Sequence, residues 1–210
     1  MGLGVLDRYS SMTIPRLRLA GLRSARAGPF DIELDEGETL AITGPSGAGK
    51  SLLLRMIADL DPHDGDAFLD GRACSSMSAA EWRRQVIYCP AESGWWHDQV
   101  GTHFVGVPQS AAALGLRPEL FEQAVATCSS GERQRLALLR ALVLGPVVLL
   151  LDEPTGPLDA ETTELVEAVL RQRLARGMTL VIVTHDERQA ERMAYRRARM
   201  EAGRMMIIDR

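Results

Sequence analysis

The sequence is poor in aromatic residues, and it has neither an excess of positive charge nor a long apolar run. Aromatic residues make up 5% of the 210 residues, and the formal net charge is −4. An acidic balance gives no support for nucleic acid as a partner, because nucleic-acid-binding domains usually carry a basic surface. The longest apolar run, near residues 147–151, is far short of the roughly 20 residues that span a bilayer. A role at a membrane would therefore need a separate membrane protein.

Cysteine is also scarce, and its positions exclude two common uses. The three cysteines, at positions 74, 89 and 128, form an odd set without paired spacing, which suits a reducing compartment and gives no metal site. The N-terminus shows no long apolar core followed by small residues, so we expect no signal peptide. We therefore expect a cytoplasmic protein. The length of 210 residues favours one domain over residues 1–210, with a small helical subdomain at approximately 92–140.

Strand and helix patterns alternate along most of the chain. This order predicts an α/β fold with a mostly parallel sheet, preceded by an antiparallel β layer over residues 16–34. Residues 1–12 read as a loose tail. The expected strands are 16–22, 30–34, 39–43, 67–69, 85–89, 147–151 and 179–184, followed by a hairpin over 196–208. The first expected helix begins after residue 50. The other expected helices cover 78–84, 111–116, 118–126, 133–144, 160–175 and 187–195.

One glycine-rich segment, residues 44–51, fits the phosphate-binding pattern G-x-x-x-x-G-K-[ST]. A β-prone run, 39–43, precedes it, and apolar residues with helical spacing follow it. A strand, a glycine turn and a helix start together aim backbone N–H groups at one anionic ligand. We expect Lys50 to reach the β- and γ-phosphates of ATP and the Ser51 hydroxyl to bind Mg²⁺. The expected cradle is Gly44, Pro45, Ser46, Gly47, Ala48, Gly49, Lys50 and Ser51.

Two carboxylates, Asp152 and Glu153, follow the apolar strand 147–151. At the carboxyl end of a buried strand, Asp152 can hold Mg²⁺ opposite Ser51. Glu153 can then act as general base toward the attacking water, while Lys50 and Mg²⁺ stabilise the developing charge. By itself an Asp-Glu pair after a strand is a common start of a turn or helix. The phosphate-binding pattern upstream favours the site.

A histidine, His185, follows the apolar strand 179–184. A lone histidine is usually structural. Parallel strands end at one edge of a sheet, so His185 is expected beside Asp152 and Ser51. We therefore predict that His185 contacts the γ-phosphate.

The order of these segments resembles the ATP-binding cassette ATPases, the nucleotide-binding subunits of ABC transporters, from about Leu17 to Met205. The family's L-S-G-G-Q signature corresponds to residues 128–132, Cys-Ser-Ser-Gly-Glu. The resemblance implies a homodimer that sandwiches ATP, in which Ser129 and the Gly131 amide of one copy contact the γ-phosphate held by the other. It also implies that Asp159, in the D-loop segment 156–159, links the two sites.

The chain departs from the family pattern at several positions. Ala91 stands where the family has a glutamine, with Glu92 next to it. Ser130 replaces the first signature glycine, and Cys128 replaces the leucine. No aromatic residue is in place to stack on adenine, and Arg23-Ser24-Ala25-Arg26 occupies that region. Because the phosphate-binding residues and the second signature glycine are intact, we predict hydrolysis.

Two adjacent tryptophans, Trp95 and Trp96, lie in the segment that faces the transmembrane subunit in the resembling family. Neighbouring side chains of an extended segment point to opposite sides. The pair is interpreted as an exposed anchor for a partner, and the alternative is one core and one surface tryptophan.

The resemblance implies an ATP-hydrolysing subunit that powers a separate integral-membrane transporter subunit from the inner face of the cell membrane. The short length resembles small bacterial exporter subunits. One alternative is a DNA-repair or chromosome-type ATPase with the same cassette, although the short insert 92–127 has no heptads or cysteine pairs. The other is an ATP-sensing module with little turnover, which Ala91 and Ser130 would permit.

Overall fold

The computed structural model describes residues 14–209, so the expected tail at 1–12 lies outside the described residues. A six-stranded sheet runs through the molecule in the order β10-β9-β3-β8-β7-β6. All its neighbouring pairs are parallel except β9 with β10, which form the hairpin expected at Gly203. Its strands are β3 (Thr39–Thr43), β6 (Val86–Cys89), β7 (Val148–Asp152), β8 (Thr179–Val183), β9 (Arg196–Glu201) and β10 (Arg204–Asp209).

A second sheet is antiparallel and has the order β2-β1-β4-β5. It contains β1 (Leu17–Arg23), β2 (Phe30–Leu34), β4 (Asp64–Leu69) and β5 (Arg72–Ala73). In β2, buried and exposed residues alternate, as expected for a strand with one face on the core. The predicted antiparallel layer beside a mostly parallel sheet is therefore confirmed.

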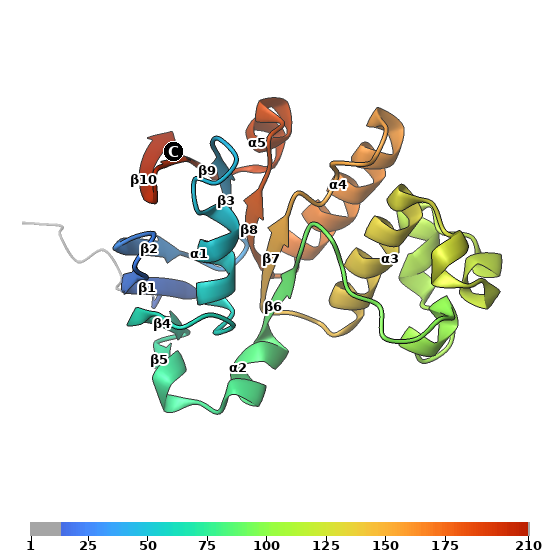
Figure 1. The fold of residues 1–210 in the computed structure, drawn as a ribbon, viewed down its shortest axis with the longest axis horizontal. Coiled ribbons are helices and arrows are strands. Elements are labelled where there is room, and N and C mark those ends of the chain that lie inside the picture. The colour runs from blue at the N-terminus through green and yellow to red at the C-terminus, as the bar shows by residue number, and fades with distance from the viewer. Residues whose placement is uncertain (1–13, 210) are drawn as a thin grey trace, which may run out of the picture.

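The three central strands β3, β7 and β8 are buried at every position. Helices cover both faces of such a parallel sheet, so its strands are continuous apolar runs rather than alternating ones. Helix α1 (Lys50–Ile57) packs between this sheet and the antiparallel one, and α3 (Ser130–Val143) and α4 (Ala160–Leu174) pack on the other face (Figure 1). The remaining α-helices are α2 (Ala79–Gln85) and α5 (Glu187–Met193).

The segment between β6 and α3 lies beside α3, on the side of the molecule away from the antiparallel sheet (Figure 1). It forms short 3₁₀ turns at Val100–His103, Gln109–Leu114, Pro118–Glu122 and Val125–Thr127, and a further one occurs at Cys74–Ser76. The expected helix over 118–126 is therefore two separate turns. Buried side chains such as Leu114 and Leu120 hold these turns against the core. Every helix within residues 14–209 is too short or too polar to cross a membrane.

Three apolar residues in or just after helices α1, α3 and α4 are exposed rather than packed in the core. Leu60 is 47% exposed because α1 ends at Ile57 and the backbone turns left-handed at Asp59, with φ 55°. Leu165 and Val143 are 40% and 50% exposed. Residues at the margin of an apolar stripe or at a helix end lie beyond the contact with the sheet. Helix α2 begins with a capping box formed by Ser78 and Glu81.

Candidate active site

The loop 44–51 connects β3 to α1 at the carboxyl edge of the large sheet. Its glycines adopt backbone angles that side chains disfavour, with φ 137° at Gly44 and 103° at Gly49. A Cβ on Gly44 would lie 2.1 Å from the Met200 carbonyl oxygen of the neighbouring strand β9. Gly49 occupies the N-cap of α1 without a side-chain cap. The N–H groups at the helix start therefore stay available for a ligand.

Lys50 is the one basic side chain of this loop, and it is 6% exposed. Its Nζ donates hydrogen bonds to the carbonyl oxygens of Gly44, at 2.7 Å, and Pro45, at 3.0 Å. Burial lowers the pKa of Lys50, while the carboxylates of Glu153 and Asp152 act in the opposite direction. The ammonium group thus lies near both acidic residues of the predicted site.

Asp152 is the last residue of β7 and is 5% exposed. Its Oδ2 accepts a hydrogen bond of 3.1 Å from the hydroxyl of Tyr88 on β6, the adjacent parallel strand. Burial, followed by the Asp152 charge, raises the pKa of Tyr88, so the phenol stays a donor. Tyr88 is a residue of the site that the sequence analysis missed. The sequence feature that could have identified Tyr88 is its position on the expected strand 85–89, which lies next to β7 in the sheet.

Glu153 and His185 meet at the carboxyl ends of β7 and β8. The backbone of Glu153 is left-handed, with φ 49°, and its amide donates to the Val183 carbonyl at 2.9 Å. One carboxylate oxygen accepts from the His185 amide at 3.2 Å, and the other lies 3.1 Å from His185 Nε2. Burial raises the pKa of Glu153, opposed by His185 and Lys50. A carboxylate with a raised pKa is a better base than an ordinary surface glutamate.

Oxygen donors for a magnesium ion are present at the same edge. Ser51 lies in the first turn of α1 with an exposed side chain, and Asp152 ends β7. A hydroxyl and a carboxylate fit Mg²⁺, which takes few protein ligands and completes its shell with water and phosphate oxygens. Within residues 14–209, no cluster of three or more His, Cys, Asp or Glu side chains is suited to hold a metal by itself.

The signature segment forms the start of α3. The Ser129 hydroxyl accepts from the Glu132 amide at 3.2 Å, and the Glu132 carboxylate accepts from the Ser129 amide at 2.8 Å. This reciprocal pair is a capping box. Cys128 is buried beside it, and Gly131 lies against Leu158. Within residues 14–209, no hydrogen bond joins Ser129 or Gly131 to the 44–51 loop.

Asp159 caps the next helix, α4. Its carboxylate accepts a hydrogen bond of 2.7 Å from the Thr162 amide, and this bond lowers the pKa of Asp159. The side chain is exposed. It is thus both a helix cap and a group accessible to another molecule.

A pocket of about 560 Å³ separates the start of α3 from the 153–157 segment. Its lining includes Ala91, Glu92, Ser130 and Glu153. Ala91 presents no polar side chain here, whereas the Glu92 carboxylate is exposed beside the pocket. The departure from the family pattern at position 91 therefore lies directly at the candidate site.

Trp95 and Trp96 are not an equivalent exposed pair. Trp95 packs partly against the hydrophobic core, whereas Trp96 is 65% exposed. The Arg140 guanidinium lies 4.6 Å from both ring centroids, and His103 makes edge contacts with both rings. The interpretation of a doubly exposed pair is wrong, and the alternative of one core and one surface tryptophan is the better description.

The turn over residues 24–27 lies close to the phosphate-binding loop. The Gly28 amide donates to the Gly203 carbonyl at 2.8 Å, and the Gly203 amide donates to the Ala48 carbonyl at 2.9 Å. Arg23 and Arg26 have exposed side chains at this turn. Residues 24–27 contain no aromatic side chain.

Known proteins similar to this chain identify its family independently of the site geometry. Residues 28–156 match the family model described as ABC transporter. The chain is 36% identical over 192 residues to an aliphatic sulfonates import ATP-binding protein of Cupriavidus necator, and 36% identical over 191 residues to an Fe(3+) ions import ATP-binding protein of Streptomyces avermitilis. These matches cover 85% and 83% of this chain, but only 62% and 55% of those proteins.

A third relative, the lipoprotein-releasing system ATP-binding protein of Geobacter metallireducens, is 36% identical, with 84% of this chain and 88% of that protein covered. Two solved structures share the fold. A bacterial Atm1-family ABC exporter with ATP bound has a TM-score of 0.81 at 22% identity, covering 91% of this chain and 38% of that one. The ATP-binding cassette MJ0796, a dimer bound to ADP and Pi, has a TM-score of 0.76 at 23% identity, covering 91% and 98%. The chain therefore belongs to the ABC transporter family as an ATP-binding cassette.

Proposed function

We propose that this chain hydrolyses ATP with Mg²⁺ and thereby powers a separate integral-membrane transporter subunit. The observation that carries the proposal is the convergence of Lys50, Asp152 and the Glu153–His185 pair at one edge of the sheet. Membership of the family indicates that the nucleotide is ATP. The hydrolysis of a triphosphate requires side chains of these types.

Each group has a distinct task in the proposed reaction. The amides of the 44–51 loop bind the phosphates, and Lys50 leaves the carbonyls of Gly44 and Pro45 for the β- and γ-phosphates. Glu153 takes the proton of the attacking water, and His185 holds the Glu153 carboxylate and contacts the γ-phosphate. Ser51 and Asp152 would hold Mg²⁺, whose chemistry is to neutralise charge on the phosphate oxygens.

A second copy of the chain would complete each site. Ser129 and Gly131 stand at the N-terminal end of α3, where free amides favour an anion, yet they make no hydrogen bond to the 44–51 loop of their own chain within the described residues. In the proposed homodimer they contact the γ-phosphate held by the other copy, and the exposed Asp159 lies between the two sites. The dimeric state of the MJ0796 structure supports this arrangement.

The proposed contact with the membrane subunit is at Trp96. This ring is 65% exposed, and Val105 and Val107 of the same segment are also exposed. Exposed aromatic side chains on a rigid support are common anchors in interfaces, and Arg140 and His103 hold this one. The protein would then act in the cytoplasm, at the inner face of the cell membrane, through that subunit.

The relatives' names favour transport over the DNA-repair or chromosome-type alternative, because they describe import and lipoprotein-releasing systems. The cargoes in these names differ from one another, so they assign none to this chain. An ATP sensor with little turnover is the second candidate function, and the observation that favours it is the apolar Ala91 in the site pocket.

A phosphate-release assay with Mg-ATP separates hydrolysis from sensing. We expect the wild type to release phosphate and Glu153→Gln to be slower by at least about a hundredfold, since it removes the general base. Binding of a fluorescent ATP analogue by Glu153→Gln serves as the folding control. Equal rates of phosphate release by the two proteins would contradict hydrolysis and support the ATP sensor. Faster phosphate release after DNA is added would instead support the DNA-repair or chromosome-type alternative.

Co-purification tests the membrane contact. The gene next to this one is co-expressed if it encodes a multi-span membrane protein, and the complex is captured through that protein. We expect Trp96→Ala to reduce recovery of the ATPase, and Tyr195→Ala, on another exposed aromatic residue, to leave it intact. Unchanged recovery with Trp96→Ala would place the contact elsewhere.

A further inference from the structure

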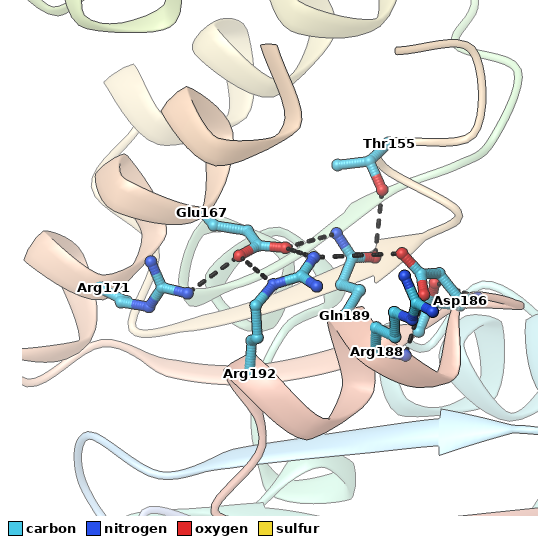
Figure 2. A network of polar contacts seen from close by, with 8 residues as sticks. Thr155, Glu167, Arg171, Asp186, Arg188, Gln189 and Arg192 are labelled. Atoms are coloured by element: carbon cyan, nitrogen blue, oxygen red, sulfur yellow. Dashed lines mark hydrogen bonds and ion pairs between the residues drawn. The ribbon is translucent and has the colours of Figure 1, made fainter. Parts of the chain in front are cut away.

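A polar network joins α4, α5 and Thr155, which lies shortly after Glu153 in the sequence (Figure 2). Its centre is Glu167 of α4, whose side chain is 1% exposed. Arg192 of α5 donates to both of its carboxylate oxygens, at 3.0 and 2.6 Å, and Arg171 donates at 2.9 Å. Gln189 of α5 donates to Glu167 at 3.4 Å. The network thus connects the two helices that follow the site.

Glu167 is ionised in this setting. Burial works to raise its pKa, but the hydrogen bonds and charges of Arg192, Gln189 and Arg171 outweigh burial and lower it. A buried carboxylate without partners would be strongly destabilising, whereas one held by several donors is tolerated. The charged carboxylate can only accept hydrogen bonds. It therefore acts as a fixed acceptor between α4 and α5.

This fixed acceptor determines how the Gln189 amide is oriented. Its NH₂ group must face Glu167, so its carbonyl oxygen faces the other way. That oxygen, Oε1, accepts a hydrogen bond of 3.1 Å from the hydroxyl of Thr155. Gln189 is 1% exposed, so water does not readily replace the partner. One hydroxyl therefore ties the 153–159 segment to α5.

Both residues of the Thr155–Gln189 hydrogen bond are close in sequence to the proposed catalytic residues Glu153 and His185. Thr155 is two residues after Glu153, and α5 begins two residues after His185. The Glu153 carboxylate contacts the amide and ring of His185. Thr155, two residues further on, contacts Gln189. The segment that carries the base and the helix that follows the histidine are therefore joined at two points.

We propose that Thr155, Gln189 and Glu167 are positioning residues that keep the side chains of Glu153 and His185 aligned with each other for hydrolysis. The inference rests on the proposed function, since it concerns the alignment of the general base. A single contact leaves the segment free to rotate about it, whereas two separate contacts, one at Glu153 and one at Thr155, restrict that rotation. The Glu167 charge maintains the second contact by fixing the Gln189 amide.

The test compares Thr155→Val, which keeps the shape and removes the hydroxyl, with Thr155→Ser, which keeps the hydroxyl. For Thr155→Val we expect kcat for ATP to fall on the order of tenfold to a hundredfold, because small misplacements of reacting groups are costly. The KM for ATP should change little, since the 44–51 loop is untouched. Thr155→Ser should restore most of kcat. Amide hydrogen exchange over residues 153–159 should be faster in Thr155→Val than in Thr155→Ser.

Thr179→Val is the matched control for a merely structural effect. The Thr179 hydroxyl is buried and donates to the Asp35 carbonyl at 2.9 Å, at the far end of β8 from His185. This variant should lose stability as Thr155→Val does, yet keep the wild-type kcat and the wild-type exchange at 153–159.

The outcomes separate this inference from the proposed function. If the wild type releases phosphate and Thr155→Val matches it in kcat, the positioning role is overturned and the proposed function stands. If the wild type releases none, the proposed function fails, and hydrogen exchange alone decides whether Thr155 fixes the segment. Equal exchange in Thr155→Val and Thr155→Ser overturns the inference in either case.

Discussion

The hydroxyl of Tyr88 donates a hydrogen bond of 3.1 Å to Oδ2 of Asp152, across two neighbouring parallel strands. Asp152 is 5% exposed, so this bond supplies part of the solvation that the buried carboxylate has lost. It also restricts rotation of the carboxylate about its χ2 bond. The side chain proposed to hold Mg²⁺ is thereby oriented before any ligand arrives.

Replacing Tyr88 by phenylalanine should destabilise the fold. Hydrogen bonds to charged groups contribute about 1.5 to 3 kcal/mol, and the buried Asp152 oxygen would be left without this donor. Urea unfolding measures the change. Tyr195→Phe is the matched control, because Tyr195 is 61% exposed, and it should change the free energy of unfolding by less than about 0.5 kcal/mol. Equal stability of the two variants would show that the Tyr88 bond contributes nothing.

Glu153→Gln should increase stability at neutral pH while it removes activity. The folded-state pKa of Glu153 is raised, mainly by burial, so the native state binds its proton more tightly than the unfolded state does. Ionisation of Glu153 therefore costs stability as pH rises through the raised pKa, and the cost vanishes below its ordinary value of about 4.3. Glutamine carries no charge at any of these pH values.

Urea unfolding at pH 7 and near pH 4 should show Glu153→Gln more stable than the wild type at pH 7, with the difference shrinking at pH 4. Glu119→Gln, at an exposed position, controls for the general loss of a carboxylate. A variant less stable than the wild type at pH 7 would mean that attraction to His185 and Lys50 outweighs burial.

Two glycines of the phosphate-binding loop should respond differently to alanine. At Gly44 a Cβ would lie 2.1 Å from the Met200 carbonyl oxygen, and φ is 137°. At Gly47 φ is 77°, and no atom beyond Gly47 and its two chain neighbours lies within 4 Å of the added carbon. Gly47→Ala should therefore cost only backbone strain, about 1 to 3 kcal/mol. Gly44→Ala should cost clearly more, because strand β9 must also move.

Thermal unfolding of both loop variants checks this order. Soluble expression of Gly47→Ala with a moderate fall in melting temperature is expected, together with a much larger fall or failure to fold for Gly44→Ala. The reverse order would show that contact with β9 does not determine the requirement for glycine at position 44.

The α/β class and the central strands were predicted correctly. The continuous apolar runs at 147–151 and 179–184 became central strands, because a buried parallel strand needs apolar residues on both faces. The segment 92–127 was harder to predict. Its short 3₁₀ turns have little intrinsic periodicity, and they are set by tertiary packing of residues such as Leu114 and Phe121. The exposed Leu165 likewise shows that periodicity defines a stripe but not its edges.

By itself, the sequence determined the α/β class, the glycine-rich loop at 44–51 and the polar residues at the strand ends, because each depends on local spacing along one strand, turn or helix. Only the tertiary structure decided that Tyr88 donates a hydrogen bond to Asp152. It also decided that Arg140 packs against Trp95 and Trp96. The network of Thr155, Gln189 and Glu167 likewise depends on the tertiary structure. These contacts join residues on different elements. Their geometry depends on how the sheet and helices pack, which no local pattern encodes.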